Sequence, residues 1–259
     1  MSLEPLASEQ IQELLTPTAA ALFPQLQIFK QLPSTNQWLL DHGQCGDVCL
    51  TEQQTAGRGR RGRVWDSPAG LNIYLSLKYC FAAIPEHLGM LGLSIGLSVA
   101  EALAQCGICQ HGVKWPNDIY IQQQKVGGIL LEAVGALQQV VVGIGLNVNV
   151  QPQHNPLITQ PWTSLAAEQG QTLNRNRLIA ALLNQLGADF QTFSTLNMAE
   201  FQRHWQRWDV LDQQPVRVMA GNEQYEGIAC GIDSQGQLRL QRPNGSITTF
   251  SSADVSVRM

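Results

Sequence analysis

The middle of the chain carries the pattern that most constrains the fold. Two short strands, Val113–Lys114 and Asp118–Ile121, are predicted on either side of Trp115-Pro116-Asn117. A glutamine turn then leads into residues 126–134, and a β-branched run over 137–150 returns alongside them. Because strands joined by short turns usually pair with each other, this segment predicts a meander of adjacent strands.

Helical patterns flank the meander, and the expected fold class is therefore α+β. Residues 86–106 repeat small and apolar side chains at helical spacing, which predicts a long buried helix. Apolar positions in Arg177–Phe190 form one helix face, and a further helix is expected near Glu200–Trp208. Leu71–Tyr79 alternates with a period of two instead, as expected of a half-buried strand.

Composition divides the chain into three expected parts. Residues 1–25 form a short extension, in which Ser8 could cap a helix that Pro17 interrupts. Residues 26–212 contain the meander and the long helices. From 213 to 259 the chain changes to short strands separated by glycine and asparagine turns, the pattern of a small β-barrel.

Charge and hydropathy exclude several classes of protein. The 259 residues carry a formal net charge of −4, so nothing indicates a general affinity for nucleic acid. No uncharged apolar run approaches membrane-spanning length, and the N-terminus lacks the basic-then-apolar order of a signal peptide. A cytoplasmic protein with no membrane partner is predicted.

The six cysteines are scattered through segments expected to lie in the core. Cys106 and Cys109 have the spacing of a redox or zinc motif, but no second Cys-x-x-Cys accompanies them. Cys45 and Cys49 could complete a four-thiolate site with them. Buried or free cytosolic thiols are the favoured interpretation.

Residues 57–63, Gly-Arg-Gly-Arg-Arg-Gly-Arg, are the most informative stretch for function. Closely spaced glycines allow positive φ angles and close approach to a ligand. Four guanidinium groups repel one another unless an anion lies among them, and their planar fork matches carboxylate and phosphate oxygens. The segment therefore predicts a clamp that closes over a polyanion. A solvated basic loop or a nucleic-acid patch is the alternative.

Two phosphate-binding motifs are excluded for this loop. Its glycine spacing fits the dinucleotide fingerprint, but residues 64–70 form a turn where a helix is required, and residues 75–85 contain no acid. The P-loop pattern also fails, because no Gly-Lys-Ser/Thr ends the segment.

Three other segments place polar groups where a ligand could meet them. Lys114-Trp115-Pro116-Asn117-Asp118 surrounds a kink with a cation, an amide and a carboxylate. Lys125-Val126-Gly127-Gly128 sets a cation beside closely approachable backbone. Residues 143–149, Gly-Ile-Gly-Leu-Asn-Val-Asn, end a buried strand in amides. Each alone is weak, since such residues are more often surface or turn residues.

Together with Ser34-Thr35-Asn36, these segments resemble biotin–protein ligases. The segments Arg-Gly-Arg-Arg-Gly, Lys-Trp-Pro-Asn-Asp, Lys-Val-Gly-Gly-Ile-Leu and Gly-Ile-Gly-Leu-Asn occur in the family's order and spacing, and the resemblance covers residues 26–259. It implies a class II synthetase-like mixed β-sheet with flanking helices and a C-terminal SH3-like barrel. It also implies an enzyme that activates biotin with ATP and Mg²⁺ as biotinyl-5′-adenylate and transfers it to a carrier lysine.

The resemblance also implies roles for individual residues. Biotin would lie against Ser34, Thr35, Asn36, Gln54, Gly57, Arg58, Gly59, Arg60, Lys125 and Gly128. ATP would lie against Arg60, Arg61, Arg63, Trp65, Lys114, Asn117, Asp118, Asn147 and Arg258. Lys125 and Arg60 are the expected catalytic residues, and Asp118 is the expected metal ligand. Arg258 is the last residue of a segment, Asp254 to Arg258, that resembles the family less closely.

The implied partner is the biotin carboxyl carrier protein of acetyl-CoA carboxylase, and homodimer formation is left open. Only about 25 residues precede the catalytic part, so a monofunctional ligase without a DNA-binding domain is expected. Two alternatives remain. One is a lipoate or octanoate acyl ligase of the same architecture, and the other is a non-catalytic biotin-binding regulator. The intact phosphate-binding set argues against the regulator.

Overall fold

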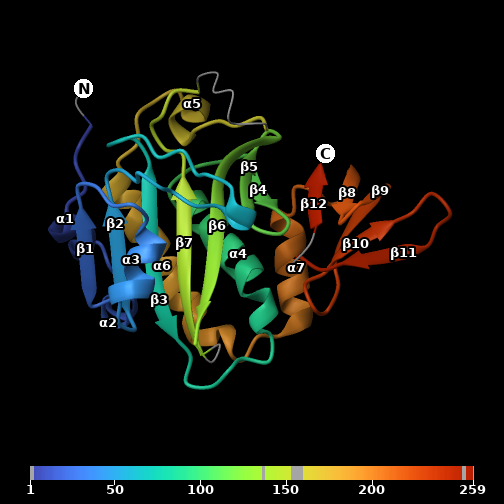
Figure 1. Ribbon diagram of the computed structural model, residues 1–259, viewed down its shortest axis with the longest axis horizontal. Helices are drawn as coiled ribbons and strands as arrows, with labels where there is room; N and C mark the ends of the chain where they lie inside the picture. The colour runs from blue at the N-terminus through green and yellow to red at the C-terminus, as the bar shows by residue number, and fades with distance from the viewer. Residues whose placement is uncertain (1–2, 136–137, 153–159, 253–254, 259) are drawn as a thin grey trace.

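A computed structural model describes residues 3–135, 138–152, 160–252 and 255–258. Its larger sheet has seven strands in the order β1-β2-β3-β7-β6-β5-β4 (Figure 1). Their bounds are β1 Gln25–Phe29, β2 Asp47–Thr51, β3 Ile73–Cys80, β4 His111–Lys114, β5 Asp118–Ile121, β6 Gln124–Val134 and β7 Gln139–Leu146. Strands β4 to β7 are consecutive neighbours, so the predicted meander is confirmed. Strands β1 and β2 pair in parallel, which makes the sheet mixed.

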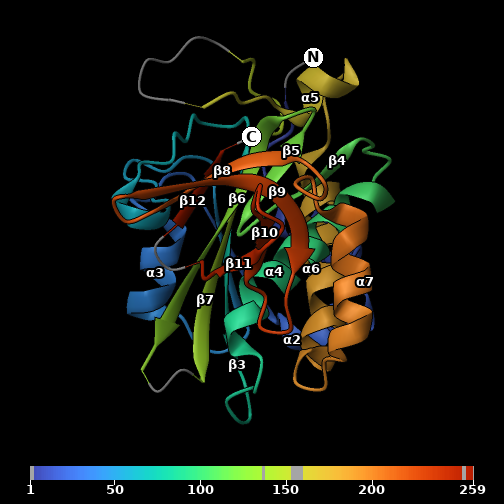
Figure 2. The same ribbon diagram turned by 90° about the vertical axis from the view of Figure 1, so that its right-hand side faces the viewer.

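Helices cover the two faces of this sheet unequally. They are α1 Ser8–Glu13, α2 Pro17–Leu22, α3 Thr35–His42, α4 Leu91–Gln105, α5 Leu165–Gln169, α6 Arg175–Phe193 and α7 Met198–Trp208, with 3₁₀ turns η1 Arg60–Gly62 and η2 Leu88–Met90. Helix α3 lies on one face, and α4, α6 and α7 lie on the other (Figure 2). The main hydrophobic core fills the space between the sheet and α4 and α6. On the α3 face, the part of the sheet that α3 does not cover leaves room for a site.

Helix α4 is the predicted long buried helix, although it begins at Leu91 after a 3₁₀ turn. Its Gly96 allows the close packing expected of it, because a Cβ there would lie 2.9 Å from Val113 Cγ1. Residues Leu88–Gln105 are long and apolar enough to cross a membrane, with a mean hydropathy of 1.4. However, 61% of this segment is buried inside the protein, as in the core helix of a globular domain.

Strand β3 differs from the half-buried strand expected from its alternation. Its first six residues are all buried, because helix α3 covers the face that the alternation predicted to be wet. The polar side chains of Ser76 and Lys78 point toward that helix. Ser76 bonds to Thr35, and the Lys78 ammonium donates to the Gly43 carbonyl at 2.8 Å. Alternation therefore identified the two faces correctly but not what covers them.

The N-terminal residues pack against α6, and Ile11 and Ala19 are fully buried. One local expectation was wrong, because Ser8 is the first residue of α1 and does not cap it. Helix α1 ends at Glu13, before Pro17 as expected. Pro17 then opens α2 at its first turn, and the Thr16 hydroxyl accepts from Ala19 N at 3.3 Å. Proline suits this position because the first helical N–H groups have no helical partner.

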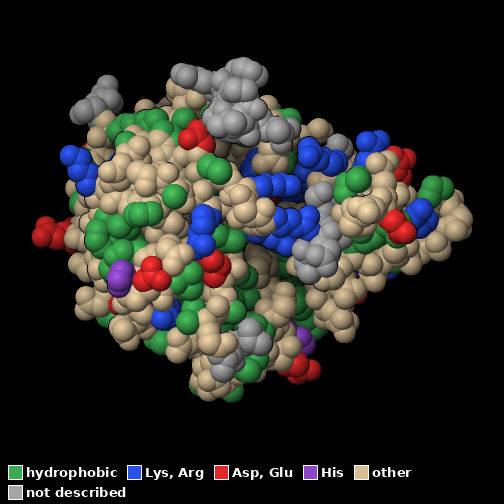
Figure 3. All heavy atoms as spheres, viewed as in Figure 1, with side chains coloured by type: hydrophobic (Ala, Val, Ile, Leu, Met, Phe, Trp, Pro, Cys, Tyr) green, Lys and Arg blue, Asp and Glu red, His purple; other side chains and the backbone are tan. Residues whose placement is uncertain are grey.

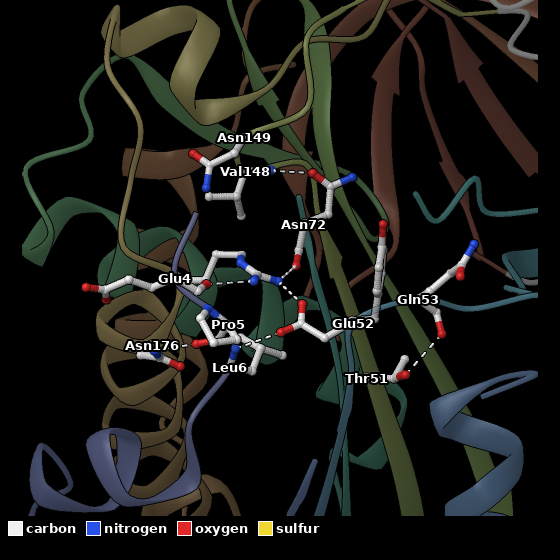
Figure 4. A network of polar contacts seen from close by, with 12 residues as sticks. Glu4, Pro5, Leu6, Thr51, Glu52, Gln53, Asn72, Val148, Asn149 and Asn176 are labelled. Carbon is white, nitrogen blue, oxygen red and sulfur yellow. Dashed lines mark hydrogen bonds and ion pairs between the residues drawn. The ribbon is translucent and has the colours of Figure 1, made fainter. Parts of the chain in front are cut away.

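A buried polar network fastens the N-terminal segment to the large sheet (Figure 4). The Arg175 guanidinium pairs with Glu52 at 2.6 Å and donates to the carbonyls of Asn72 and Glu4. Glu52 accepts a further bond from Leu6 N at 2.7 Å. Four chain segments thus meet at one arginine, whose side chain is only 2% exposed.

The C-terminal residues form a second sheet of five antiparallel strands in the order β11-β10-β9-β8-β12. Their bounds are β8 Pro215–Ala220, β9 Glu223–Ile232, β10 Leu238–Gln241, β11 Ile247–Phe250 and β12 Val255–Arg258. This sheet stands beside the β4–β5 end of the large sheet (Figure 1). The buried Trp115 indole donates to the Gly236 carbonyl at 3.0 Å and joins the two sheets. Asp254, part of the looser sequence match, lies outside the described residues.

The cysteines do not form the four-thiolate site. Cys45 is bonded to Cys80 in a disulfide with Cα atoms 5.6 Å apart, so these two are neither zinc ligands nor free thiols. Cys49 is buried, and burial raises its pKa to about 12. Cys106 and Cys109 are free and exposed. Among the described residues no cluster of three or more His, Cys, Asp or Glu could hold a metal ion.

Candidate active site

A cavity of about 380 Å³ opens on the α3 face of the large sheet. It extends from the start of α3, past the arginine loop and the middle of β3, β6 and β7, to the β4–β5 turn and Arg258 of the C-terminal sheet. Lysine and arginine side chains gather around the hollow between the two sheets (Figure 3). One end of the cavity is lined by uncharged polar groups and the other by cations.

The uncharged end begins at the N-terminus of α3. Ser34 caps this helix by accepting from Gln37 N at 3.4 Å. Gln54, just beyond β2, accepts from Thr35 N at 3.0 Å and from the Thr35 hydroxyl at 3.2 Å. Its amide nitrogen donates to Ser67 at 3.2 Å. These bonds hold the polar groups in fixed directions, as recognition of a small polar ring requires.

Asn36 completes this end and is 96% buried, since only 4% of it is exposed. Its amide oxygen accepts from the Ser76 hydroxyl, and its amide nitrogen donates to Glu132 at 2.8 Å. Gly143 of β7 makes room for it, because a Cβ at that position would overlap the Asn36 amide. Both polar ends of Asn36 are thus engaged by protein.

Glycines of β6 and β7 form a flat floor for the tryptophan that follows the arginine loop. Gly128 and Gly145 are register partners across the two strands. A Cβ at Gly145 would lie 2.7 Å from the Trp65 ring, and one at Gly128 would lie 3.2 Å from it. The Trp65 indole therefore lies directly on the sheet and forms part of the pocket wall, with Lys125 Nζ 5.2 Å from its ring centre.

The arginine loop crosses the mouth of the cavity as a short folded hairpin. Trp65 N donates to the Gly57 carbonyl at 2.9 Å, and Gly59 N donates to the Arg63 carbonyl at 2.7 Å. Arg61 has a left-handed backbone with φ of 57°, which is costly for a residue with a side chain. Val64, which pairs with Arg58 across the hairpin, is 83% exposed.

Two arginines of this loop bind different parts of the protein. Arg58 pairs with Glu132 of β6 at 2.9 Å. Arg60 donates to Asn117 Oδ1 at 3.1 Å and to the carbonyl of Ser252, which lies between strands β11 and β12. Burial, followed by the neighbouring Arg61, lowers the pKa of Arg60. A nearby anion would stabilise this partly desolvated cation.

The cationic end is centred on the β4–β5 turn and the start of β6. Lys125 Nζ lies 2.7 Å from Asp118 Oδ1. The Lys114 ammonium is buried, donates to the Tyr120 hydroxyl at 3.2 Å and lies 4.6 Å from that ring centre. Burial lowers the pKa of Lys114 to about 8, and the positive charges of Arg258 and Lys125 add to this shift.

Asn147 positions the wall opposite the loop. Its amide nitrogen donates to the Thr163 carbonyl at 3.1 Å, and its backbone N–H donates to Val126 at 2.8 Å. Lys125 N donates to the Pro161 carbonyl at 3.0 Å, which fixes the same segment from its other end. Asn147 thus shapes this wall of the pocket through its bonds to the Thr163 and Val126 carbonyls.

All site residues predicted from sequence are described, and all but Gly57 line the one cavity. Gly57 lies beneath it, where a Cβ would collide with the Trp65 carbonyl. Sequence reasoning missed four residues that complete the site: Ser76, Glu132, Gly143 and Gly145. Ser76 and Glu132 are polar positions inside otherwise apolar strands, which is a usable signal. Gly143 and Gly145 belong to the segment 143–149, in which only the asparagine side chains at the end of the strand indicated a site.

Two family models match the chain. The model described as the biotin/lipoate A/B protein ligase family matches residues 28–147, and the biotin protein ligase C-terminal domain matches residues 214–258. The bifunctional ligase/repressor BirA of Escherichia coli is 39% identical over 88% of this chain and 72% of that protein. The biotin--[acetyl-CoA-carboxylase] ligase of Mycobacterium tuberculosis is 34% identical over 89% of this chain and 88% of that one.

A solved structure agrees with these matches. The biotin protein ligase of Aquifex aeolicus, in complex with biotin and ATP, has a TM-score of 0.80 and 29% identity, covering 91% of this chain and 99% of that one. The chain belongs to the biotin/lipoate A/B protein ligase family. The expected mixed sheet, the C-terminal domain and the ATP-dependent biotin ligase activity are confirmed.

Proposed function

We propose that this ATP-dependent biotin ligase transfers biotin to a lysine of the biotin carboxyl carrier protein of acetyl-CoA carboxylase. Relatives from Mycobacterium tuberculosis and Paracoccus denitrificans bear the name of that carboxylase. The observation that carries the proposal is the difference in charge between the two ends of the pocket. An uncharged hydrogen-bonding end meets a cationic end under a single arginine loop, which suits a neutral ring joined through its carboxylate to a phosphate.

The ring of biotin is assigned to the α3 end of the cavity. Ser34, Thr35 and Gln54 present hydroxyl and amide groups there, and Gln54 and Thr35 are already fixed by mutual bonds. The backbone of Arg58 and Gly59 lies across this end as a cover. The apolar chain of biotin would then run past the Trp65 indole, which covers the glycine floor, toward Lys125.

In the first half-reaction, a biotin carboxylate oxygen attacks the α-phosphorus of ATP, and the bond to pyrophosphate breaks. Two anions must approach each other, so fixed cations provide most of the stabilisation. Lys125 is assigned to the carboxylate, and Arg60, Arg61 and Arg63 to the phosphates. Lys114, Asn117, Asn147 and Arg258 complete the nucleotide side, with Trp65 against the adenine. All of them border the cavity.

In the second half-reaction, the carrier lysine attacks the acyl carbon of the biotinyl-adenylate. An amide bond forms, the amine loses a proton and AMP leaves. Lys125 lies at the junction of the two ends of the pocket, where it can neutralise charge on the leaving group as well. Arg60 joins the loop to Asn117 and to the C-terminal sheet, so the loop can retain the intermediate until the carrier arrives.

A Mg²⁺ ion fits the donor groups of the cationic end. Magnesium is commonly held by one or two carboxylates together with substrate phosphates and water. Asp118 supplies such a carboxylate on the pocket wall, where it pairs with Lys125. When bound, the ion would neutralise phosphate charge. Asp118 would hold it once Lys125 turns to the biotin carboxylate.

Homodimer formation is proposed on the free edge of β6. Strand β5 pairs with β6 only as far as Gly128, whereas β7 continues to pair with it to Val134. Residues 130–134 of β6 therefore present an unpaired edge among the described residues, and such edges add strands from other chains. Light scattering with and without biotin and ATP tests this.

The absence of DNA binding stays a prediction.

A cytoplasmic location is also proposed. Reducing conditions there favour opening of the Cys45–Cys80 bond. Cys80 lies at the end of β3 opposite the pocket, which is lined by residues at the start of that strand. Ligase activity should therefore be the same with and without a thiol reductant.

Carrier labelling tests the function directly. The protein is incubated with ATP, Mg²⁺, biotin and a biotin carboxyl carrier domain, and attached biotin is detected with streptavidin. Lipoate and octanoate replace biotin in parallel to test the acyl-ligase alternative. Pyrophosphate release without the carrier separates an enzyme from a non-catalytic regulator. Labelling by lipoate but not biotin, or no pyrophosphate with any acid, would overturn the proposal.

A further inference from the structure

Glu132 joins the polar end of the pocket to the arginine loop. One carboxylate oxygen accepts from the Asn36 amide at 2.8 Å. The Arg58 guanidinium donates to both carboxylate oxygens, at 2.9 and 3.1 Å. Asn36 belongs to α3 and Arg58 to the loop, so a single side chain on β6 contacts both walls of the site.

The surroundings of Asn36 allow it one orientation only. The Ser76 hydroxyl donates to its amide oxygen, and Gly143 leaves just enough space beside it. The amide nitrogen faces Glu132, because rotating the amide would place its oxygen against a carboxylate. The Ser76 hydroxyl does not decide between the two orientations, since it can donate or accept. The Glu132 carboxylate is therefore held in a fixed position by the ligand-binding helix.

A carboxylate is unexpected in contact with Asn36 and Arg58, two residues that line a pocket proposed to bind anions. Its charge opposes a carboxylate-bearing ligand unless a cation offsets it. Arg58 provides that cation, and the pair is partly buried, with 39% of the Arg58 and 25% of the Glu132 side chain exposed. Neither side chain then contributes net charge to the site. Their pairing instead fixes where the loop lies.

We propose that Glu132 is a positioning residue that holds the arginine loop over the biotin ring by pairing with Arg58. This inference rests on the proposed placement of biotin at the α3 end of the cavity. The Arg58 backbone lies next to Gly59 on the cavity wall, so anchoring its side chain sets the cover over the ring. Biotin contacts with α3 and closure of the loop then reinforce each other through Asn36 and Glu132.

The test is a double-mutant cycle with Glu132→Gln, Arg58→Gln and the double variant. Glutamine at 132 keeps an oxygen for Asn36 but presents an N–H₂ group to Arg58. Each single change is expected to raise the biotin dissociation constant about fivefold, mainly through faster release, and the double variant should be no weaker than either single one. The KM for ATP should rise by less than the biotin dissociation constant does, since the pair lies away from the cationic end.

Two further measurements separate this role from a merely structural one. Without any ligand, trypsin should cut after Arg60, Arg61 or Arg63 several times faster in Glu132→Gln than in the wild type. Glu226→Gln is the matched control, because it removes a carboxylate from the exposed Arg217–Glu226 pair of the C-terminal sheet. That control should change neither biotin affinity nor cleavage of the loop.

Additive losses in the double variant, or single variants with wild-type biotin affinity and loop cleavage, would overturn the role of Glu132 alone. A general loss of thermal stability with equal effects on biotin and ATP would also overturn it, in favour of a structural role. A wild-type protein that binds no biotin would overturn the proposed function, and the inference with it.

Discussion

At the scale of single residues, the site depends on how each polar group is surrounded. Lys114 and Lys125 are close in the fold but differ in their partners. Lys114 contacts a tyrosine and is desolvated, whereas Lys125 pairs directly with Asp118. In the proposed mechanism, Lys125 exchanges that carboxylate for the carboxylate of biotin without losing an ionic partner. This exchange makes it the residue whose loss should affect chemistry most.

Lys125→Ala should lose adenylate formation far more than stability. A cation at the developing negative charge is worth on the order of 3 kcal/mol, so pyrophosphate release should fall at least about 100-fold. Lys78→Met is the matched control, since Lys78 is buried and bonded to Gly43 but lies outside the cavity. It should lower stability and spare the rate. Near-normal pyrophosphate release by folded Lys125→Ala would refute the assignment.

Arg60→Gly should still form biotinyl-adenylate but retain it poorly. The change removes the bonds to Asn117 and Ser252 that fasten the loop, without removing Lys125. Released adenylate acylates lysines nonspecifically, so biotin should appear on an added bystander protein. Arg217→Gly, on the outer sheet, should give no such labelling. Slower release of adenylate than in the wild type, with no bystander labelling, would contradict this prediction.

The sequence predicted these residues only where several polar groups cluster within a few positions. Arg60, Lys114 and Lys125 stand in dense motifs that resemble a family. Ser76 and Glu132 are single polar residues inside strands, and their partners lie 40 and 96 positions away. Local pattern identifies such a residue as unusual, but only the paired strands show what it contacts.

At the scale of elements, local sequence patterns predicted the strands and helices themselves better than they predicted which elements pair or pack with each other. The meander β4–β7 followed from short turns, which force adjacent strands to pair. In contrast, β3 lies beside β7, and β1 pairs in parallel with β2. The β3–β7 pairing joins strands distant along the chain, and no local feature specifies it. The β1–β2 pairing joins consecutive strands through helix α3, a crossover of the kind that parallel pairing requires. The helices of the N-terminal extension pack on α6, a contact between distant segments that no local pattern indicated.

Arg175→Met should destabilise the fold strongly. It leaves Glu52, whose side chain is 18% exposed, without its ionic partner, and breaking such a pair costs roughly 3–5 kcal/mol. Urea denaturation measures the loss. Adding Glu52→Gln should recover part of it, because the unpaired charge is removed. Arg217→Met breaks an exposed pair and should cost less than about 1 kcal/mol. Equal losses in both arginine variants would contradict the argument.

Asp209, at the end of α7, should make stability depend on pH. Burial raises the pKa of Asp209 from the ordinary 3.8 to about 6, and the nearby charge of Asp212 adds to this rise, although Leu211 N and the Trp205 indole donate to the carboxylate and oppose it. The folded state therefore holds a proton that the unfolded state has lost between these two values. The resulting stabilisation is complete below pH 3.8 and is lost as pH rises through 6.

The measurement compares the wild type with Asp209→Asn in urea from pH 4 to 7. The asparagine cannot titrate, so the difference in free energy of unfolding isolates Asp209. Relative to this variant, the wild type should lose on the order of 2–3 kcal/mol across the range. A difference that does not change with pH would show that the carboxyl group titrates alike in both states.

At the scale of the whole molecule, the site lies between two sheets, and the arginine loop contacts both. Arg60 bonds to Asn117 beside the large sheet and to Ser252 beside the small one, while Arg258 of β12 borders the cavity. Sequence composition separated the two sheets. Their placement could not be predicted, because it depends on a few contacts such as Trp115 with Gly236.

The loop over residues 57–65 should open without ligand and close when biotin and ATP bind. Its glycines raise the entropy of the open state, and its arginines repel one another until an anion arrives. Closure also holds Arg61 in a left-handed backbone conformation. Ordering costs roughly 1–2 kcal/mol per residue, which ligand contacts must offset. Biotin and ATP should therefore strengthen each other's binding, since either one orders the loop for the other.

Limited trypsin digestion measures this closure, because the enzyme cuts after arginine in open loops. Cleavage after Arg58, Arg60, Arg61 and Arg63 should slow at least about tenfold with both ligands and less with either alone. Arg242, in the β10–β11 turn away from the cavity, provides an internal control that the ligands should not protect. Protection at Arg242 as well would indicate general stabilisation of the fold. Equal cleavage of the loop with and without ligands would show that it does not act as a cover.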